Sequence, residues 1–307
     1  MAPSNLKYNP TTHSTPLIKI FITFLFLQYH NVNSQYSPIP ISSPPEPSPE
    51  PSPSPSSPQP PRPESTVSFT IEQFKEDDPN IFVLGDASIS DGIVSLTKTD
   101  QYGKPLQKSV GRVTHITPIH IWDKTSGKLA DFSTGFSFIV NTNGSKFHGD
   151  GFTFFLGPLD FDLPKNSSGG YLGLFNPETA LVPSQNPVIA IEFDTYTNGW
   201  DPSSPSQFPH IGIDIGSLDS VATVNWPIDD FVETNALGEA SISYISESKK
   251  LSVFVDYPNS EREGFSVSYV VDLRSVLPEW VRVGFSAATG ELVETHDITN
   301  WSFDSAL

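Results

Sequence analysis

The feature that most constrains the fold is a long succession of short segments in which apolar and polar residues alternate. These segments fill residues 66–307, and Gly, Pro, Asn and Asp separate them. The clearest pair is 240–244 and 251–257, joined by a polar turn at 247–249. A period of two predicts strands with one buried face, so we expect this pair to form an antiparallel hairpin.

The rest of residues 66–307 has the same character, and helical periodicity is nearly absent. One short helical turn is expected at 272–277, before Pro278. So many short strands between turn residues predict an all-β domain, either a sandwich or a barrel. The other expected strands are 67–74, 135–140, 151–156, 188–196, 210–215, 264–271, 281–287 and 298–303.

Composition excludes several classes of protein. The chain has no cysteine, which rules out a disulfide framework, a zinc–thiolate site and a thiol nucleophile. Lys and Arg total 17 against 35 Asp and Glu, a formal net charge of −18, which argues against nucleic acid or an anionic membrane as partner. The 22 Phe and nine Tyr are enough to fill a sizeable core.

The N-terminal part has a different composition. Residues 1–34 contain an apolar stretch at 20–27, shorter than the roughly 20 residues that span a bilayer, and predict a signal peptide cleaved near Ser34; a membrane anchor is the alternative. Residues 35–65 are rich in Pro, Ser and Glu and predict an extended, disordered linker, either a wall-associated stalk or an inert spacer. The folded domain is expected to be 66–307, with no membrane span in the mature chain.

The densest group of potential metal ligands lies at 191–201. Glu192 and Asp194 are two apart on an expected strand, so their carboxylates leave the same face, and a turn at Asn198-Gly199 can bring Asp201 back toward Asp194. Asp194, Asn198 and Asp201 with the Tyr196 carbonyl would give the oxygen ligands that calcium prefers. Glu192, Asp194, Asp201 and the imidazole of His210 form a mixed set that suits manganese or another transition metal.

Three other interpretations compete for this segment. An EF-hand is rejected, because Pro205 stands where its bidentate Glu belongs. A solvated acidic edge without metal would be common, but these carboxylates lie on a strand that reads as buried, where an unpaired charge is costly. A glycoside hydrolase needs two carboxyl groups flanking the bond, and the next same-face position is Tyr196, so that pair is incomplete.

A second motif, at 148–156, places Asp150 between two glycines at the start of an apolar strand. By itself it could be an ordinary turn. Together with the other motifs, however, it makes residues 67–307 resemble the legume lectin (L-type lectin) family, with the motifs in the family's order along nearly the whole domain. The matching motifs are 149–156 (GDGFTFFL), 169–173 (GGYLG), 192–196 (EFDTY), 200–202 (WDP), 210–214 (HIGID), 277–281 (LPEWV), 287–290 (AATG) and 301–303 (WSF).

The resemblance implies a concanavalin-like jelly-roll sandwich, with a flat back sheet and a curved front sheet, and a secreted, non-enzymatic lectin dependent on Ca²⁺ and Mn²⁺. It assigns the manganese ligands to Glu192, Asp194, Asp201 and His210, with Ser220 holding a manganese-bound water, and the calcium ligands to Asp194, Tyr196, Asn198 and Asp201. It also implies a cis peptide at Gly149–Asp150. The carbohydrate-binding residues it implies are Asp150, Gly170, Tyr196, Asn198, Glu291 and Leu292.

Further expectations concern ligands and assembly. The last loop, 290–296, is short, which in this family favours mannose/glucose binders over galactose binders. The expected partners are mono- and oligosaccharides or glycoproteins, bound by a homodimer or homotetramer in the apoplast or cell wall. Asn143 and Asn166 begin glycosylation sequons in segments that we expect to form loops, whereas the sequon at Asn300 falls within an expected strand.

Overall fold

The computed structural model describes residues 66–202, 208–232 and 235–307. The expected signal peptide, 1–34, and linker, 35–65, lie outside the described residues. Within the described part, no helix is both long enough and apolar enough to cross a membrane.

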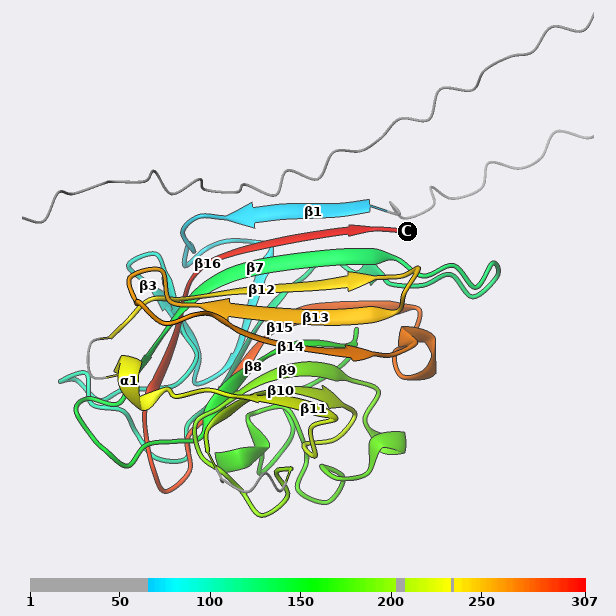
Figure 1. Ribbon diagram of the computed structural model, residues 1–307. Coiled ribbons are helices and arrows are strands. Elements are labelled where there is room, and N and C mark those ends of the chain that lie inside the picture. Colours follow the sequence, from blue (N-terminus) through cyan, green and yellow to red (C-terminus); the bar gives the residue numbers. More distant parts are fainter. Residues whose placement is uncertain (1–65, 203–207, 233–234) are drawn as a thin grey trace, which may run out of the picture. The chain divides into compact units, whose positions relative to one another are not determined.

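Two antiparallel sheets make up the domain, and in Figure 1 the sheet with β7, β12 and β16 lies above the sheet with β8, β9 and β10. The first sheet has the order β14-β13-β12-β7-β16-β4-β3, and β1 pairs with β16 beside that path. Its strands are β1 Thr66–Ile71, β3 Ser88–Ser90, β4 Ile93–Ser95, β7 Asp131–Asn141, β12 Gly238–Ile245, β13 Lys250–Asp256, β14 Phe265–Val270 and β16 Thr295–Ala306.

The second sheet has the order β11-β10-β9-β8-β15-β5-β2, with β6 paired to β15. Helices are short and few among the described residues. The strands are β2 Ile81–Gly85, β5 Val110–His115, β6 Ile119–His120, β8 Gly151–Pro158, β9 Ile189–Asp194, β10 His210–Ile215, β11 Ala222–Asn225 and β15 Trp280–Ala288. The helical segments are η1 Gly169–Tyr171, η2 Pro183–Gln185, α1 Asp229–Val232 and η3 Leu273–Ser275.

The main core lies between the sheets and is rich in aromatic side chains, whereas a smaller apolar cluster covers the other face of the second sheet. On β9, Ile191 and Phe193 belong to the main core, and Ala190 belongs to the smaller cluster with Leu172 and Phe175. Because strand side chains alternate between faces, every second residue of β9 points away from the main core. This is the face that carries the polar site.

The all-β sandwich predicted from the alternation is confirmed. The hairpin at 240–257 is β12 and β13, with buried and more exposed residues alternating along β12, and the expected helical turn is η3. The strand expected over 188–196 ends earlier, at Asp194, because the backbone N–H of Tyr196 donates to the Asp194 carboxylate and the chain turns there. The sequence did not predict β2–β6 or β11, which are short or carry little clean alternation.

Candidate functional site

Two neighbouring strands bring a group of polar side chains together under the outer loops. In the antiparallel register of β9 and β10, His210 lies opposite Asp194, and Gly212 lies opposite Glu192. Glu192, Asp194 and His210 are all buried, and each places a ligand atom within 4.8 Å of the others. His210 Nε2 lies 2.8 Å from Glu192 Oε1.

Ser220 and Asp214 complete this buried group, which we call the acidic centre: Glu192, Asp194, Asp201, His210, Asp214 and Ser220. The Ser220 hydroxyl lies 2.6 Å from Glu192 Oε1 and 2.7 Å from Asp214 Oδ1. Gly212 makes room for them, because a Cβ there would lie 2.1 Å from Ser220 Oγ and 2.4 Å from Glu192 Oε1. The sequence analysis had not assigned Asp214 to the site. The alternation along β10 could have identified it, because a period of two puts residues 210, 212 and 214 on one face of the strand.

The turn after β9 brings Asp201 back to this centre, as predicted. The backbone N–H of Asn198 donates to Asp201 Oδ2, and the N–H of Asp201 donates to the Asn198 carbonyl at 3.3 Å. Burial, together with the charge of Glu192, raises the pKa of Asp201 to about 6. Burial with the charges of Glu192 and Asp201 raises the pKa of Asp194 well above its usual value.

The acidic centre has the properties of a cation site. Burial followed by the charge of Glu192 also raises the pKa of Asp214 well above its usual value, and His210 is the only basic side chain in the group. Among the described residues, Asn198 Oδ1, Asp201 Oδ1 and Asp214 Oδ2 are buried without a hydrogen-bond partner. Buried anions that crowd together need positive charge, and carboxylate, amide and imidazole donors are ligands for hard and borderline cations. The residues present therefore fit a metal.

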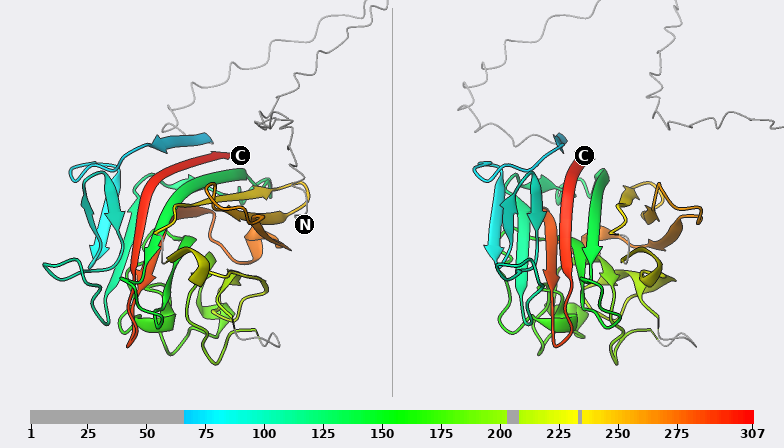
Figure 2. Two further views of the ribbon diagram at one scale, coloured as in Figure 1. Left: turned by 60° about the vertical axis from the view of Figure 1, so that its left-hand side comes forward. Right: turned by 90° about the vertical axis from the view of Figure 1, so that its left-hand side faces the viewer.

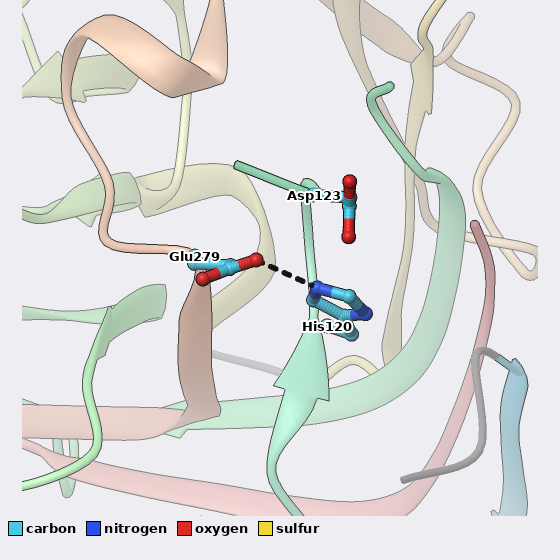
Figure 3. Close-up of side chains that lie close together, drawn as sticks. All are labelled: His120, Asp123 and Glu279. Atoms are coloured by element: carbon cyan, nitrogen blue, oxygen red, sulfur yellow. Dashed lines mark hydrogen bonds and ion pairs between the residues drawn. The ribbon is translucent and has the colours of Figure 1, made fainter. Parts of the chain in front are cut away.

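A second cluster of ionisable side chains differs, because the protein itself supplies hydrogen-bond donors to its carboxylates (Figure 3). It consists of His120, Asp123 and Glu279. Asp123 Oδ1 accepts from the backbone N–H and hydroxyl of Ser126, at 2.6 and 2.7 Å. Glu279 Oε1 accepts from the backbone N–H of Lys124 at 3.0 Å. These hydrogen bonds lower the pKa of both carboxyl groups, whereas the pKa values of the aspartates in the acidic centre are raised. The carboxylates of this second cluster are therefore stable without a cation.

Above the acidic centre, four loops converge on Asp150. The Gly149–Asp150 peptide is cis, as the resemblance implies, and the Asp150 carboxyl group is buried, with Oδ2 lacking a partner among the described residues. Gly290 approaches so closely that a Cβ on it would lie 2.8 Å from Asp150 Oδ2 and 3.2 Å from the Cα of Gly169. Figures 1 and 2 show the corresponding segments, the red turn before β16 and the green segment with η1, side by side at one end of the sheets.

Asn198 lies against Gly170, the residue after Gly169. A Cβ on Gly170 would lie 2.1 Å from Asn198 Oδ1, so the two residues meet only because residue 170 has no side chain. The Asp150 carbonyl accepts from the Thr195 N–H at 3.0 Å, which ties its loop to the end of β9. Burial, followed by the charge of Glu294, raises the pKa of Asp150 to about 7.

Tyr196, Glu291 and Leu292 border this group. A Cβ on Gly149 would lie 2.9 Å from Tyr196 Cβ and 3.7 Å from Leu292 Cβ. Glu291 is largely exposed, pairs with Lys108 Nζ at 3.2 Å, and accepts at its carbonyl from Gln107 Nε2 at 2.6 Å. The structure thus places Tyr196 and Leu292 against Gly149, whereas the contacts of Glu291 are with Lys108 and Gln107.

Two buried groups that the sequence had not connected hold these loops. Glu294, fully buried, contacts His148 and His296 at 2.9 Å each and accepts from the Thr195 hydroxyl. Arg112, also fully buried, donates to the carbonyls of Phe161, Asp162 and Gly173 and so fastens both ends of the segment with Gly169 and Gly170. Apart from His296, which is two residues from Glu294, the members of these pairs are between 49 and 146 residues apart, so no local pattern marks them.

The sequons differ in their surroundings. Asn143 and Asn166 are exposed and stand in turns, each with a positive φ, at 51° and 58°. Asn300 lies in β16, partly buried, next to the fully buried Trp301. The exposed pair has the surroundings that a glycan requires, and Asn300 does not.

Comparison with known proteins agrees with this geometry. The family model described as the legume lectin domain matches residues 66–306. Lectin 9 of Medicago truncatula is 75% identical over 297 residues, covering 96% of this chain and 99% of the relative. The metal-free form of lectin I-B4 from Griffonia simplicifolia superposes with a TM-score of 0.73 at 41% identity, covering 78% of this chain and 100% of that structure.

Relatives with named sugars differ among themselves. The mannose/glucose-specific lectin of Centrolobium tomentosum is 42% identical over 247 residues, covering 79% of this chain and 96% of the relative. Lectin I from Ulex europaeus, solved with the methyl glycoside of α-L-fucose, has a TM-score of 0.71 at 37% identity, covering 79% of this chain and 99% of that structure.

Proposed function

The chain belongs to the legume lectin family, and from that premise we propose that the Asp150 site binds mannose or glucose residues of glycans when calcium and manganese occupy the acidic centre. The chain is a carbohydrate-binding protein and not an enzyme, since its relatives are named lectins. The glycoside hydrolase alternative is therefore dropped.

One observation carries the proposal: a buried carboxylate oxygen of Asp150 has no partner among the described residues, while Gly290 and Gly169 lie close to the Asp150 carboxyl group. A buried acceptor without a partner is costly, so a ligand that donates hydrogen bonds gains affinity there. Two vicinal sugar hydroxyl groups are such donors. In this proposal Asp150 accepts their protons, and Asn198 and the N–H groups of Gly170, Glu291 and Leu292 donate to sugar oxygens.

Tyr196 completes the site from one side. Its side chain is 44% exposed and lies beside Gly149, next to Asp150. A half-exposed aromatic ring can cover the apolar C–H face of a pyranose while the hydroxyl groups bind the polar groups. With so few hydrogen bonds, a single site would bind a monosaccharide at about millimolar strength. A homodimer or homotetramer would then supply useful avidity on a multivalent glycan.

Legume lectins bind metal ions. We assign calcium to Asp194, the Tyr196 carbonyl, Asn198 and Asp201, and manganese to Glu192, Asp194, Asp201 and His210, with Ser220 beside them. The cations would supply the positive charge that the crowded carboxylates lack. Asn198 belongs to both the calcium set and the sugar set, so ordering its amide through the metal also orients it for the ligand.

The mannose/glucose preference rests on the short last loop, 290–296, and on the mannose/glucose-specific relative from Centrolobium tomentosum. The fucose complex of the Ulex europaeus lectin shows that this fold also serves other sugars, so the sugar class is the part of the proposal that most needs direct measurement.

The remaining parts of the proposal concern the whole chain. Plant legume lectins are generally secreted or vacuolar. We propose a secreted protein with a signal peptide at 1–34, a linker at 35–65 and the lectin domain at 66–307, carrying glycans at Asn143 and Asn166 and acting in the apoplast or cell wall. Mass spectrometry of the purified native protein tests both the mature N-terminus and the glycans.

A glycan array tests the function. The protein is applied untreated, after chelation with EDTA, and after chelation followed by Ca²⁺ and Mn²⁺. We expect signals on mannose- or glucose-terminated glycans that EDTA abolishes and the two metals restore. Binding that survives thorough chelation would refute the metal dependence, and signals confined to galactose or fucose glycans would refute the sugar class. An array without any signal would refute the assignment of the site.

A further inference from the structure

Arg112 is a fully buried cation to which the proposed function gives no role. Its side chain extends from β5 into the smaller apolar cluster on the outer face of the second sheet. The guanidinium carbon lies over two aromatic rings, 4.9 Å from the centre of the Phe155 ring and 4.5 Å from that of Phe161. A buried charge is costly unless hydrogen bonds compensate it, so the partners of this side chain indicate what it does.

All the hydrogen bonds of the Arg112 side chain go to one segment, residues 161–173, which we call the glycine segment. Nη1 donates to the carbonyls of Phe161 and Asp162 at 2.7 and 3.1 Å, and Nη2 donates to the carbonyl of Gly173 at 2.7 Å. Within the described part of the chain the side chain makes no other hydrogen bond, and its Nε is buried without a partner. Arg112 therefore ties a core strand to the two ends of this segment, and not one core strand to another.

The middle of the glycine segment meets the residues proposed to bind the sugar. A Cβ on Gly169 would lie 3.9 Å from each carboxylate oxygen of Asp150, and a Cβ on Gly170 would lie 2.1 Å from Asn198 Oδ1. Both approaches depend on where the backbone of the segment lies. A binding site keeps its affinity only while its groups stay within about 0.5 Å of their positions, so whatever holds this backbone affects the site.

The turn that follows Gly170 needs to be held. Leu172 has a φ of 54°, in the left-handed region that a residue with a Cβ rarely adopts, and its N–H donates to the Gly169 carbonyl at 3.0 Å. A backbone in such a conformation persists only when its surroundings restrain it. Gly173, the next residue, donates its N–H to the Ser167 carbonyl at 2.8 Å and accepts from Arg112 at its own carbonyl.

We propose that Arg112 is a positioning residue of the sugar site, which sets the sugar affinity by holding the backbone of Gly169 and Gly170 in place. This inference rests on the proposed function, because the two glycines border a sugar only if Asp150 binds one. Arg112 acts at a distance, since a fully buried side chain cannot contact a ligand in solution. The guanidinium group suits this role because its planar fork donates to two places at once, which an ammonium group on a single atom does not reproduce.

The test compares Arg112→Met and Arg112→Lys with the parent protein. Methionine keeps the unbranched apolar stem but donates no hydrogen bond, and lysine keeps the charge but lacks the fork. Arg282→Met is the matched control, because Arg282 is a partly buried arginine on the neighbouring strand β15. Val255→Ala is the control for lost stability alone, because it truncates a buried side chain on β13 in the other sheet.

Calorimetry with metal-loaded full-length protein measures Kd for methyl α-mannoside, and electron paramagnetic resonance without sugar measures Kd for Mn²⁺. We expect Arg112→Met to weaken sugar binding at least about tenfold and to leave the Kd for Mn²⁺ within about twofold of the parent value. Arg112→Lys should lie between the parent and Arg112→Met in sugar affinity. Arg282→Met and Val255→Ala should bind the sugar like the parent.

Hydrogen exchange gives a second measurement, which needs no ligand. The N–H groups of Leu172 and Gly173 should exchange at least about tenfold faster in Arg112→Met than in the parent, because the segment opens locally once its charged hydrogen bonds are lost. The N–H groups of β9 should exchange at the parental rate in both proteins. A structural role spread over the whole domain would instead speed up exchange in β9 as well.

Parental sugar affinity of Arg112→Met would overturn the proposal, and so would an equal loss of affinity in Val255→Ala. A matching loss of Mn²⁺ affinity would also overturn it, because Arg112 would then act through the acidic centre. If Arg112→Met does not fold, Arg112→Lys carries the test, and parental affinity of that variant overturns the proposal. If the parent itself does not bind methyl α-mannoside, the proposed sugar class fails, whereas exchange at Leu172 and Gly173 still decides whether Arg112 holds the segment, so the two failures are distinguishable.

Discussion

His148 Nδ1 lies 2.9 Å from Glu294 Oε2, and this buried contact joins the loop of Asp150 to the turn that precedes β16. The other oxygen of Glu294 accepts from the Thr195 hydroxyl, at the end of β9, and from His296. One carboxylate thus holds two of the loops that meet at the proposed sugar site. Both nitrogens of His148 face carboxylates, since Nε2 lies 2.9 Å from Asp229 Oδ1, so the ring is best placed as a cation that donates twice.

The contact between His148 and Glu294 predicts that the free energy of unfolding depends on pH. Burial lowers the pKa of His148, but the hydrogen bonds and charges of Glu294 and Asp229 outweigh burial and raise it to about 9, from an ordinary 6.5. A raised pKa in the folded state means that the stabilisation is complete below about pH 6.5 and is lost as the pH rises through about 9. The free energy of unfolding of the parent should therefore fall over this range more steeply than that of His148→Gln.

The measurement is urea unfolding of the parent and His148→Gln at pH 6, 7.5 and 9. At pH 6 the variant should be less stable by about 1.5–3 kcal/mol, the usual worth of a hydrogen bond between charged groups. The difference should shrink toward pH 9. A difference that stays constant over the range would show that the ring is neutral in the folded protein.

Asp150→Asn should abolish sugar binding without unfolding the protein. The amide has nearly the same shape, but it loses the negative charge and one acceptor, so the two hydroxyl groups of the sugar lose charge-assisted hydrogen bonds. Binding should weaken at least about 100-fold. Asp123→Asn is the control, because Asp123 lies in the half-buried cluster of Figure 3. Calorimetry with methyl α-mannoside measures both variants, and near-parental affinity of Asp150→Asn would mean that the carboxylate lies outside the site.

Removal of metal should lower the thermal stability as well as the sugar affinity. At a metal concentration 100 times Kd, binding to the folded state alone contributes about 2.7 kcal/mol. For a domain of this size that corresponds to a fall in Tm of roughly 5–10 °C on chelation. Differential scanning calorimetry with EDTA, and then with excess Ca²⁺ and Mn²⁺, makes the measurement. An unchanged Tm would argue that the acidic centre holds no cation.

Gly170→Ala should impair sugar binding far more than stability. The new Cβ would lie 2.1 Å from Asn198 Oδ1, and the end of the Asn198 side chain can swing away at little cost to the fold. That movement removes the amide from the sugar and calcium positions that we propose for it, so affinity should fall at least about tenfold, the effect of 1.4 kcal/mol.

Gly199→Ala is the matched control, since a Cβ at residue 199 would meet nothing within 4 Å. It should bind sugar like the parent protein, and both variants should unfold within a few degrees of the parent. If the two substitutions weaken binding equally, the loops around Asn198 tolerate no alanine in general, and the close approach of Gly170 to Asn198 is not the cause.

Much of the site could be predicted from short-range pattern. The period of two puts Glu192 and Asp194 on one face of β9, and the turn at Asn198-Gly199 returns Asp201 to them; both expectations hold in the structure. The same period along β10 would have yielded Asp214, which the prediction overlooked. The resemblance to legume lectins supplied Asp150 and Gly170, which no spacing rule connects to β9.

The sequence by itself determined the all-β class, the faces of the strands and the ligand types, because alternation and turn residues act over a few neighbouring positions. Only the tertiary structure decided that Gly290 lies against Asp150, that Gly170 lies against Asn198, and that Glu294 contacts His148. These contacts depend on which strands become neighbours in a sheet whose order is not the chain order. Strand order is set by how the whole core packs, and no local window of sequence contains that information.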